Sequence, residues 1–143
     1  MSINVEDLLY ALDNDNNTGV AGLTASKIKQ EKNDVLQKLQ LSKEELKDFH
    51  TRLADYRYVD EINGLQDGRY IRWIPLNVET AEIKLTNGAF LVRTVLNDDG
   101  VILICRNTKR QSVVVKFDNV LIFQKLSEQE LILVKALTIL DKK

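Results

Sequence analysis

The sequence predicts an α+β fold, with an N-terminal helical arm, a small antiparallel β-barrel or meander of five to six strands, and a C-terminal helix. Two periodicities predict this fold. Apolar residues recur at helical spacing over residues 24–57, whereas between residues 70 and 125 they alternate at the two-residue spacing of strands. We therefore divide the 143 residues into an acidic helical arm, 1–67, and an antiparallel β-domain with its C-terminal helix, 68–143.

The arm is expected to begin with a short helix over residues 5–12. Asn4 is the expected N-cap, and Glu6 and Asp7 lie in the first turn, where the helix dipole favours acidic side chains. The Asn- and Asp-rich run that ends at Gly19 should stop this helix, because these residue types favour turns.

Residues 24–57 carry the strongest helical pattern of the chain. Seven of the nine a and d positions of one heptad frame are apolar, and Lys32 and Ser42 occupy the other two. Two interpretations stay open. The segment is either one coiled-coil helix or a helical hairpin, because Ser42 and Glu45 form a capping box that would start a second helix. In the coiled coil, the partner-binding residues are Ile28, Val35, Leu39, Leu46, Phe49, Leu53 and Tyr56.

The first strand of the β-domain is expected over residues 68–76, with two-residue alternation established by Tyr70. Side chains alternate between the two faces of a strand, so Ile71 and Trp73 share the face that we expect to pack in the core. Tyr70 and Arg72 point to the opposite face and are the strand's candidates for outside contact.

Five further strands are expected, each separated from the next by turn residues. Asn87-Gly88 is the strongest hairpin signal, because a type I′ turn needs positive φ at both central residues. Consecutive short strands joined by tight turns form an antiparallel meander, and such a meander can curl into a barrel. These strands cover residues 81–86, 89–96, 101–106, 112–117 and 120–125.

The chain is expected to end in a helix that starts with a second capping box, Ser127 to Glu130. Leu133, Leu137 and Leu140 follow at i, i+4 and i+7, which makes one apolar stripe. Such a stripe is suited to plugging the open end of a barrel or covering a sheet.

The residues that usually carry catalysis or bind metals are scarce. His50 is the only histidine and Cys105 the only cysteine, so neither a multi-histidine zinc site nor an internal disulfide can form. No catalytic or phosphate-loop motif is present, and no apolar run reaches the length of a membrane span. We therefore expect no enzyme activity, no cofactor, no bound metal and no membrane partner, and we expect a reducing compartment such as the cytoplasm.

Charge is divided unevenly along the chain. Residues 1–67 carry 8 Lys and Arg against 13 Asp and Glu, a net charge of −5, whereas residues 68–126 carry 9 against 5, a net charge of +4. Aromatic rings stack on bases, and Arg and Lys neutralise phosphates, so the β-domain offers candidates for nucleic-acid binding. These candidates are Tyr70, Arg72, Arg93, Arg106, Lys109 and Arg110.

Residues 45–76 read ELKDFHTRLADYRYVDEINGLQDGRYIRWIPL. This segment resembles one found in uncharacterised proteins of large nucleocytoplasmic DNA viruses, in which a helix and a Tyr-rich linker precede a Gly-x-Tyr-Ile-Arg-Trp-Ile strand and a small β-domain. The resemblance implies a virus-encoded protein that acts in the host cytoplasm or is packaged in the virion. It brings no catalytic residues.

Two functions follow from these patterns. The first is a non-enzymatic interaction or assembly module that pairs with itself or with another protein through the helical arm and the β-domain surface. The alternative is a small β-barrel that binds nucleic acid through Arg, Lys, Tyr and Trp on its strand faces.

Overall fold

The computed structural model describes residues 4–20, 22–76 and 82–141 and confirms the α+β fold class. Three 3-10 turns accompany the main elements at Asp15–Val20, Ile62–Gly64 and Phe117–Asn119. The helices are α1 (Val5–Asp13), α2 (Ala25–Gln37), α3 (Lys43–Arg52) and α4 (Glu128–Asp141). The strands are β1 (Tyr56–Val59), β2 (Tyr70–Pro75), β3 (Ala89–Asn97), β4 (Gly100–Arg106), β5 (Ser112–Lys116) and β6 (Val120–Lys125).

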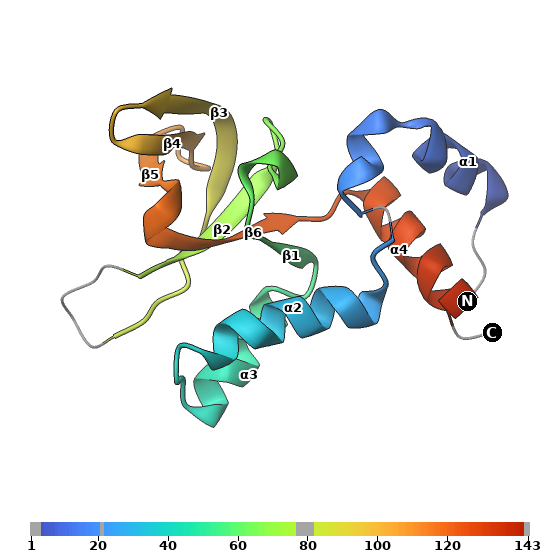
Figure 1. The fold of residues 1–143 in the computed structure, drawn as a ribbon, viewed down its shortest axis with the longest axis horizontal. Coiled ribbons are helices and arrows are strands. Elements are labelled where there is room, and N and C mark those ends of the chain that lie inside the picture. Colours follow the sequence, from blue (N-terminus) through green and yellow to red (C-terminus); the bar gives the residue numbers. More distant parts are fainter. Residues whose placement is uncertain (1–3, 21, 77–81, 142–143) are drawn as a thin grey trace.

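The six strands form one antiparallel sheet in the order β1-β6-β2-β3-β4-β5 (Figure 1). Strands β2 to β5 are a meander, as predicted. After β5, the 3-10 turn Phe117–Asn119 sends the chain back, so that β6 inserts between β2 and β1. The expectation of a closed barrel is wrong, because β1 and β5 are the two ends of the sheet and do not pair with each other.

Strand β1 corrects the expectation of helix through residue 57. Helix α3 ends at Arg52, and Tyr56 pairs with Lys125 of β6. A four-residue strand has little local signal of its own. The free edge of β6, which is distant in sequence, supplies the ladder hydrogen bonds that decide the conformation of these residues.

The helical segment of the arm is two helices, so the hairpin interpretation is confirmed and the single coiled-coil helix is wrong. Helix α2 ends at Gln37, and Gln40 has a φ of 55°, which a continuous helix cannot contain. Helix α3 then begins at the predicted capping box, in which the backbone N–H of Glu45 donates to Ser42 Oγ and the N–H of Ser42 donates to the Glu45 carboxylate, each at 3.1 Å.

Residues 82–88 form no strand, which corrects the expected strand 81–86; Ala81 lies outside the described residues. The segment still lies beside β2, because the N–H of Thr86 donates to Trp73 O at 3.0 Å and the N–H of Trp73 donates to Thr86 Oγ1 at 3.1 Å. A side chain thus replaces one ladder carbonyl. Gly88 has a φ of +90°, but Asn87 has no positive φ, so the turn is not type I′.

The two faces of the sheet bury different clusters. Trp73 lies on the first face and is 8% exposed, as predicted for a core residue. The opposite face is covered by α2, α3 and residues 82–88 only at the β1-β6-β2 end (Figure 1), where Phe123 and Leu53 are fully buried. The β3-β4-β5 end of the sheet lies away from all four helices in Figure 1. The first-face core is Ile71, Trp73, Ala89, Leu91, Leu103, Cys105, Val115 and Ile122.

Helix α4 lies beside α1 and neither plugs nor covers the sheet (Figure 1). Its capping box is as predicted, with the N–H of Ser127 donating to Glu130 Oε1 at 2.9 Å. Leu133 of the predicted stripe is buried against α1, but Leu140, at the far end, is 64% exposed. The helix packs on α1 through an apolar cluster in which Ala11 and Leu133 are both buried.

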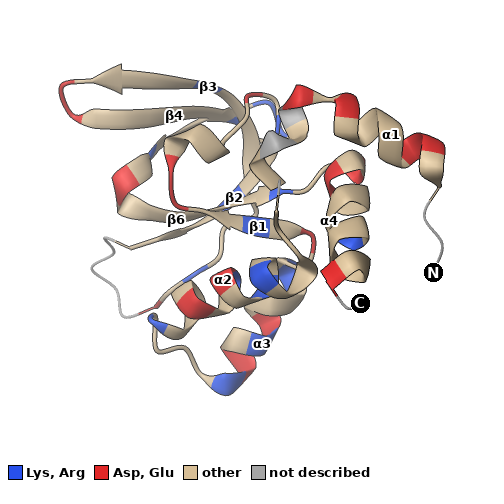
Figure 2. Ribbon diagram, turned by 45° about the vertical axis from the view of Figure 1, so that its right-hand side comes forward, with Lys and Arg blue, Asp and Glu red and all other residues tan. Residues whose placement is uncertain are grey.

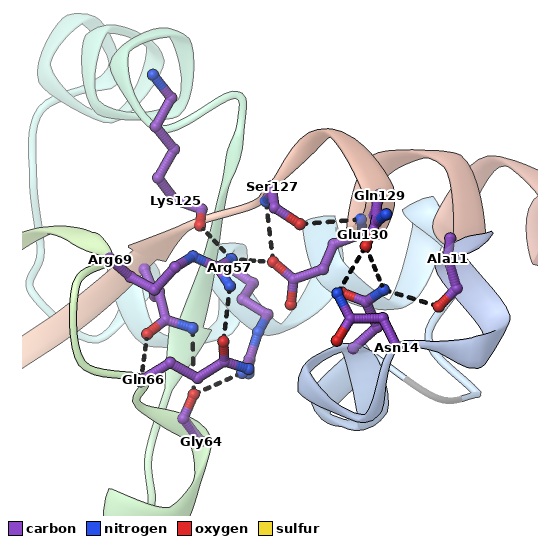
Figure 3. Close-up of polar contacts among 12 residues, drawn as sticks. Ala11, Asn14, Arg57, Gly64, Gln66, Arg69, Lys125, Ser127, Gln129 and Glu130 are labelled. Atoms are coloured by element: carbon purple, nitrogen blue, oxygen red, sulfur yellow. Dashed lines mark hydrogen bonds and ion pairs between the residues drawn. The ribbon is translucent and has the colours of Figure 1, made fainter. Parts of the chain in front are cut away.

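A buried polar network holds the linker 60–69, the sheet and α4 together (Figure 3). Glu130, which is 0% exposed, forms an ion pair with Arg69. Arg69 also donates to Gln66 Oε1 at 2.9 Å and to the carbonyl of Lys125 at 2.8 Å. Arg57 donates to the carbonyl of Gly64 at 2.7 Å, and burial lowers the pKa of its guanidinium while the Glu130 charge acts in the opposite sense. A buried ion pair whose members keep further hydrogen bonds is the arrangement that offsets the cost of desolvation.

Candidate nucleic-acid interface

The sheet face opposite the Trp73 core is basic and aromatic, and its β3-β4-β5 end lies away from the four helices. Residues paired directly across antiparallel strands share a face. The register pairs Tyr70 with Phe90 and Phe90 with Arg106, and the alternation of β2 adds Arg72 to this face. The register shifts between Leu91 and Arg93, so that Arg93 pairs with Ile104 and lies on the same face as Phe90. We call this surface the basic face after its four cations, Arg72, Arg93, Arg106 and Lys116. The register and strand alternation also place on it Tyr70, Phe90, Val95, Ile102, Ile104, Ser112 and Val114.

A shallow groove of ≈ 580 Å³ lies at one end of the basic face. Phe90 is 46% exposed and forms part of the groove wall together with Arg106 and Arg110. None of the described residues that line the groove is Asp or Glu. The groove lining is Gly68, Phe90, Leu91, Val92, Arg106, Asn107, Thr108 and Arg110.

The ring of Phe90 is held in place from one side by Tyr70. The two ring centroids are 4.9 Å apart, and the rings meet edge to face at 82°, a favourable aromatic geometry. The Tyr70 hydroxyl donates to the carbonyl of Asn87 at 2.7 Å, and Arg72 Nε donates to the carbonyl of Thr86 at 2.8 Å. Tyr70 and Arg72 therefore support the face while staying half-buried.

The β4–β5 turn brings Arg110 to the groove. Asn107 accepts two backbone hydrogen bonds at Oδ1, from Lys109 and Gln111, each at 3.0 Å. Arg110 has a φ of 64°, a left-handed conformation that few non-glycine residues adopt. Backbone bonds between Asn107 and residues 110 and 111 close the same turn, so it forms without a glycine. It directs the chain so that Arg110 joins the groove lining.

The structure gathers most of the predicted nucleic-acid residues and separates one. Arg106 and Arg110 line the groove, and Tyr70, Arg72 and Arg93 lie on the same face of the sheet. Lys109 is exposed at the β4–β5 turn and is not part of the groove lining.

Phe90 is the residue that the sequence interpretation missed. Tyr70 and Phe90 belong to strands connected by residues 76–88, so no local turn signal fixes their pairing. The Asn87-Gly88 signal predicts a hairpin with residues 81–86 instead, which is not the pairing that β3 makes.

The residues predicted to bind a partner through the helical arm are used within the chain. Phe49, Leu53 and Tyr56 are buried between the helices and the sheet, and Ile28 is buried next to α4. The three others, Val35, Leu39 and Leu46, are partly buried against the same cluster as Phe49.

The polar residue of the heptad pattern, Lys32, also has an intramolecular role. Its ammonium donates to the carbonyl of Leu53 at 2.8 Å, where α3 ends. A lysine at the carboxyl end of a helix satisfies carbonyls that lack a helical partner.

The two residues with catalytic side chains lie apart from the groove lining. His50 is on α3, where its Nε2 lies 3.1 Å from Asn33 Oδ1. Cys105 is buried in the core, and burial raises the pKa of its thiol to about 11. Within the described ranges 4–20, 22–76 and 82–141, no three His, Cys, Asp or Glu side chains group as metal ligands would.

Charge over the rest of the molecule is mixed. Figure 2, in which the ribbon is coloured by residue type, shows acidic residues along α1 and at the β3–β4 turn, and residues of both signs on α2 and α3. The basic face is therefore a local feature of a chain whose net charge is −1. Of the helices in the described part of the chain, none has the length and apolar character needed to cross a membrane.

Comparisons with protein-family models, curated proteins and solved structures find no match to the chain. They do not bear on the resemblance of residues 45–76 to viral proteins, which stays a prediction.

Proposed function

We propose that the protein is a non-enzymatic binding module that holds single-stranded nucleic acid in the groove on its basic face. The observation that carries the proposal is the exposed Phe90 ring, supported edge-on by Tyr70 and flanked by Arg106 and Arg110. An exposed aromatic ring between cations is the arrangement that stacks a base and neutralises its phosphates.

Several further features support a single strand over a duplex. The groove is shallow and follows strands rather than presenting a helix that could enter a major groove. Arg93 and Lys116 extend the positive charge along the same face, beyond the groove. A flexible strand could follow this line of cations while one base stacks on Phe90.

Fluorescence anisotropy with a labelled oligothymidylate tests the proposal. Stacking on an aromatic residue is worth about 1–3 kcal/mol per base, so Phe90→Ala should weaken binding by about 5- to 150-fold. Arg106→Ala and Arg110→Ala should each reduce the slope of log K against log salt by about 0.7, because each removes one phosphate contact.

Lys38→Ala is the matched control, since Lys38 is an exposed cation at the end of α2 and lies outside the groove lining. It should leave both affinity and salt slope unchanged. The absence of binding at low salt, or binding that does not respond to salt, contradicts the proposal.

A second candidate is an assembly module, and a specific observation favours it. Val5, Leu9 and Leu12 recur at i, i+4 and i+7 on α1 and are 67%, 56% and 62% exposed. Because the heptad residues of the arm are occupied within the chain, this stripe on α1 is the surface that would pair with another protein or a second copy. Sedimentation tests self-association: Leu9→Glu should convert an oligomer to a monomer, and a wild-type chain that is monomeric at micromolar concentration excludes it.

Two earlier expectations supply a context for either function. The single, buried Cys105 is compatible with a reducing compartment such as the cytoplasm. The resemblance of residues 45–76 to viral proteins supports placement in the host cytoplasm or in a virion.

A further inference from the structure

A second cavity, of ≈ 460 Å³, lies between α2, α3 and the first half of α4, among elements distinct from those that form the basic face. It is within the usual size range of small-molecule sites. Its lining is Ala25, Ile28, Lys29, Lys32, Lys47, His50, Thr51, Ala54, Leu126, Leu131 and Val134.

The cavity lining has apolar and basic parts. Leu131 and Val134 are one turn apart on α4 and, together with Ile28 of α2, form the apolar part. Lys47 and His50, one turn apart on α3, belong to the basic part. The lining is therefore apolar where α4 contributes and cationic where α3 contributes.

The basic part is positively charged without an acidic partner in the lining. Lys29, Lys32 and Lys47 all contribute, and none of the described lining residues is Asp or Glu. Burial, and then the charges of Lys32 and Lys29, lower the pKa of His50. Asp55, which lies outside the lining, partly opposes the effect of burial on the pKa of Lys32.

The cations differ in how firmly they are placed. Lys32 is 5% exposed, and its ammonium donates to the carbonyl of Leu53 at 2.8 Å and to that of Ala54 at 3.5 Å. Lys29 and Lys47 are exposed. One buried charge together with two exposed charges around the same cavity is suited to a single anionic group.

We propose that this cavity binds a small anionic amphiphile, with a phosphate or carboxylate head against the lysines and a short alkyl tail against Ile28, Leu131 and Val134. The match is one of charge and polarity together: the head meets cations that lack an acidic partner in the lining, and the tail covers apolar side chains of α4 and α2. This site is independent of the groove on the basic face.

Titration of the full chain with octyl phosphate tests the proposal. His50 is the only histidine, so its imidazole signals in an NMR spectrum report on the cavity without ambiguity. They should shift on titration and give a dissociation constant. Affinity should rise by about fourfold for each methylene added between butyl and octyl phosphate, the value for a buried methylene.

Variants of the exposed lysines complete the test. Lys29→Gln together with Lys47→Gln should weaken binding by about fivefold or more, as expected for the loss of two partly solvated ion pairs. Both residues are exposed, so folding should be unaffected. Lys27→Gln is the matched control, because Lys27 is an exposed lysine of α2 outside the lining.

Three outcomes overturn the proposal. Inorganic phosphate that binds as tightly as octyl phosphate would show an adventitious surface anion. Octanol that binds as tightly would show an apolar cavity with no use for its lysines. Binding of octyl phosphate that does not respond to the double variant would place the ligand elsewhere.

Discussion

Replacing Glu130 by alanine should destabilise the protein strongly without changing either proposed binding site. Glu130 is 0% exposed and is the acidic member of the network that joins the linker, β6 and α4. Alanine removes the ion pair with Arg69 and the hydrogen bond from the N–H of Ser127. It also deprives Arg57, which is 7% exposed, of the largest of the acidic charges that oppose the effect of burial on its pKa.

The expected size of the effect follows from these contacts. Removing one partner of a buried ion pair costs about 3–5 kcal/mol. The side chain of Arg69 is 17% exposed and keeps its bonds to Gln66 and Lys125, which places the cost near the lower end of that range. Loss of the capping bond to Ser127 adds to the cost. We expect a total of about 3–4 kcal/mol, equivalent to a fall in Tm of roughly 10–15 °C for a chain of this length.

Urea denaturation followed by the fluorescence of Trp73 measures this cost directly, because Trp73 is the only tryptophan and lies in the core. The midpoint should fall while the slope m stays constant. Glu130→Gln keeps the volume and one acceptor but removes the charge, and should cost less than alanine. Glu128→Ala is the control, since Glu128 is an exposed acid in the same helical turn and should cost within about 0.5 kcal/mol. Equal stability of Glu130→Ala and Glu128→Ala would refute the reasoning.

Three further predictions concern a turn and two titrating groups. Gly88→Ala should cost more than Gly22→Ala, because both glycines have positive φ but a Cβ at Gly88 would lie 2.3 Å from Ile71 O, whereas one at Gly22 meets nothing within 4 Å; thermal melts that show equal costs contradict this. Cys105 should resist iodoacetamide at about pH 8 until the chain is unfolded in urea, since its pKa of about 11 keeps the thiol neutral; rapid labelling of the folded chain would contradict burial. The unfolding free energy should also fall as pH rises above the ordinary thiol pKa of 9.0, because there the unfolded chain loses the thiol proton more readily than the folded chain. The imidazole of His50 should titrate below pH 6.5 in NMR spectra, because burial and the nearby lysines lower its pKa. The unfolded chain then binds the proton more readily, so the unfolding free energy should decrease as pH falls below 6.5, and this part of the pH dependence should vanish in His50→Gln.

The elements that sequence reasoning predicted correctly are those with a complete local signal. The capping boxes at Ser42 and Ser127 were predicted because the cap and its acidic partner are three residues apart, so both hydrogen bonds form within one turn. Strand alternation placed Trp73 in the core for the same reason, since successive side chains of a strand must face opposite sides.

Tertiary pairing decided the rest. Strand β1 exists because β6, more than sixty residues away in the sequence, offers an unpaired edge at Tyr56–Val59. Residues 82–88 lack a strand although Leu85 is buried as the alternation requires, because Thr86 bonds to β2 through its side chain and interrupts the ladder. Neither the pairing of β1 with β6 nor the bond between β2 and the Thr86 side chain can be read from a local sequence pattern.

Local patterns in the chain are enough to establish which residues are apolar, where helices begin, and which side chains of a strand share a face. Which surfaces remain free follows from the tertiary fold, because burial depends on contacts between distant segments. Six of the seven apolar heptad residues were folded inward against the sheet, and Ile28 was buried beside α4. Phe90, Arg106 and Arg110 were brought to one groove by two separate turns.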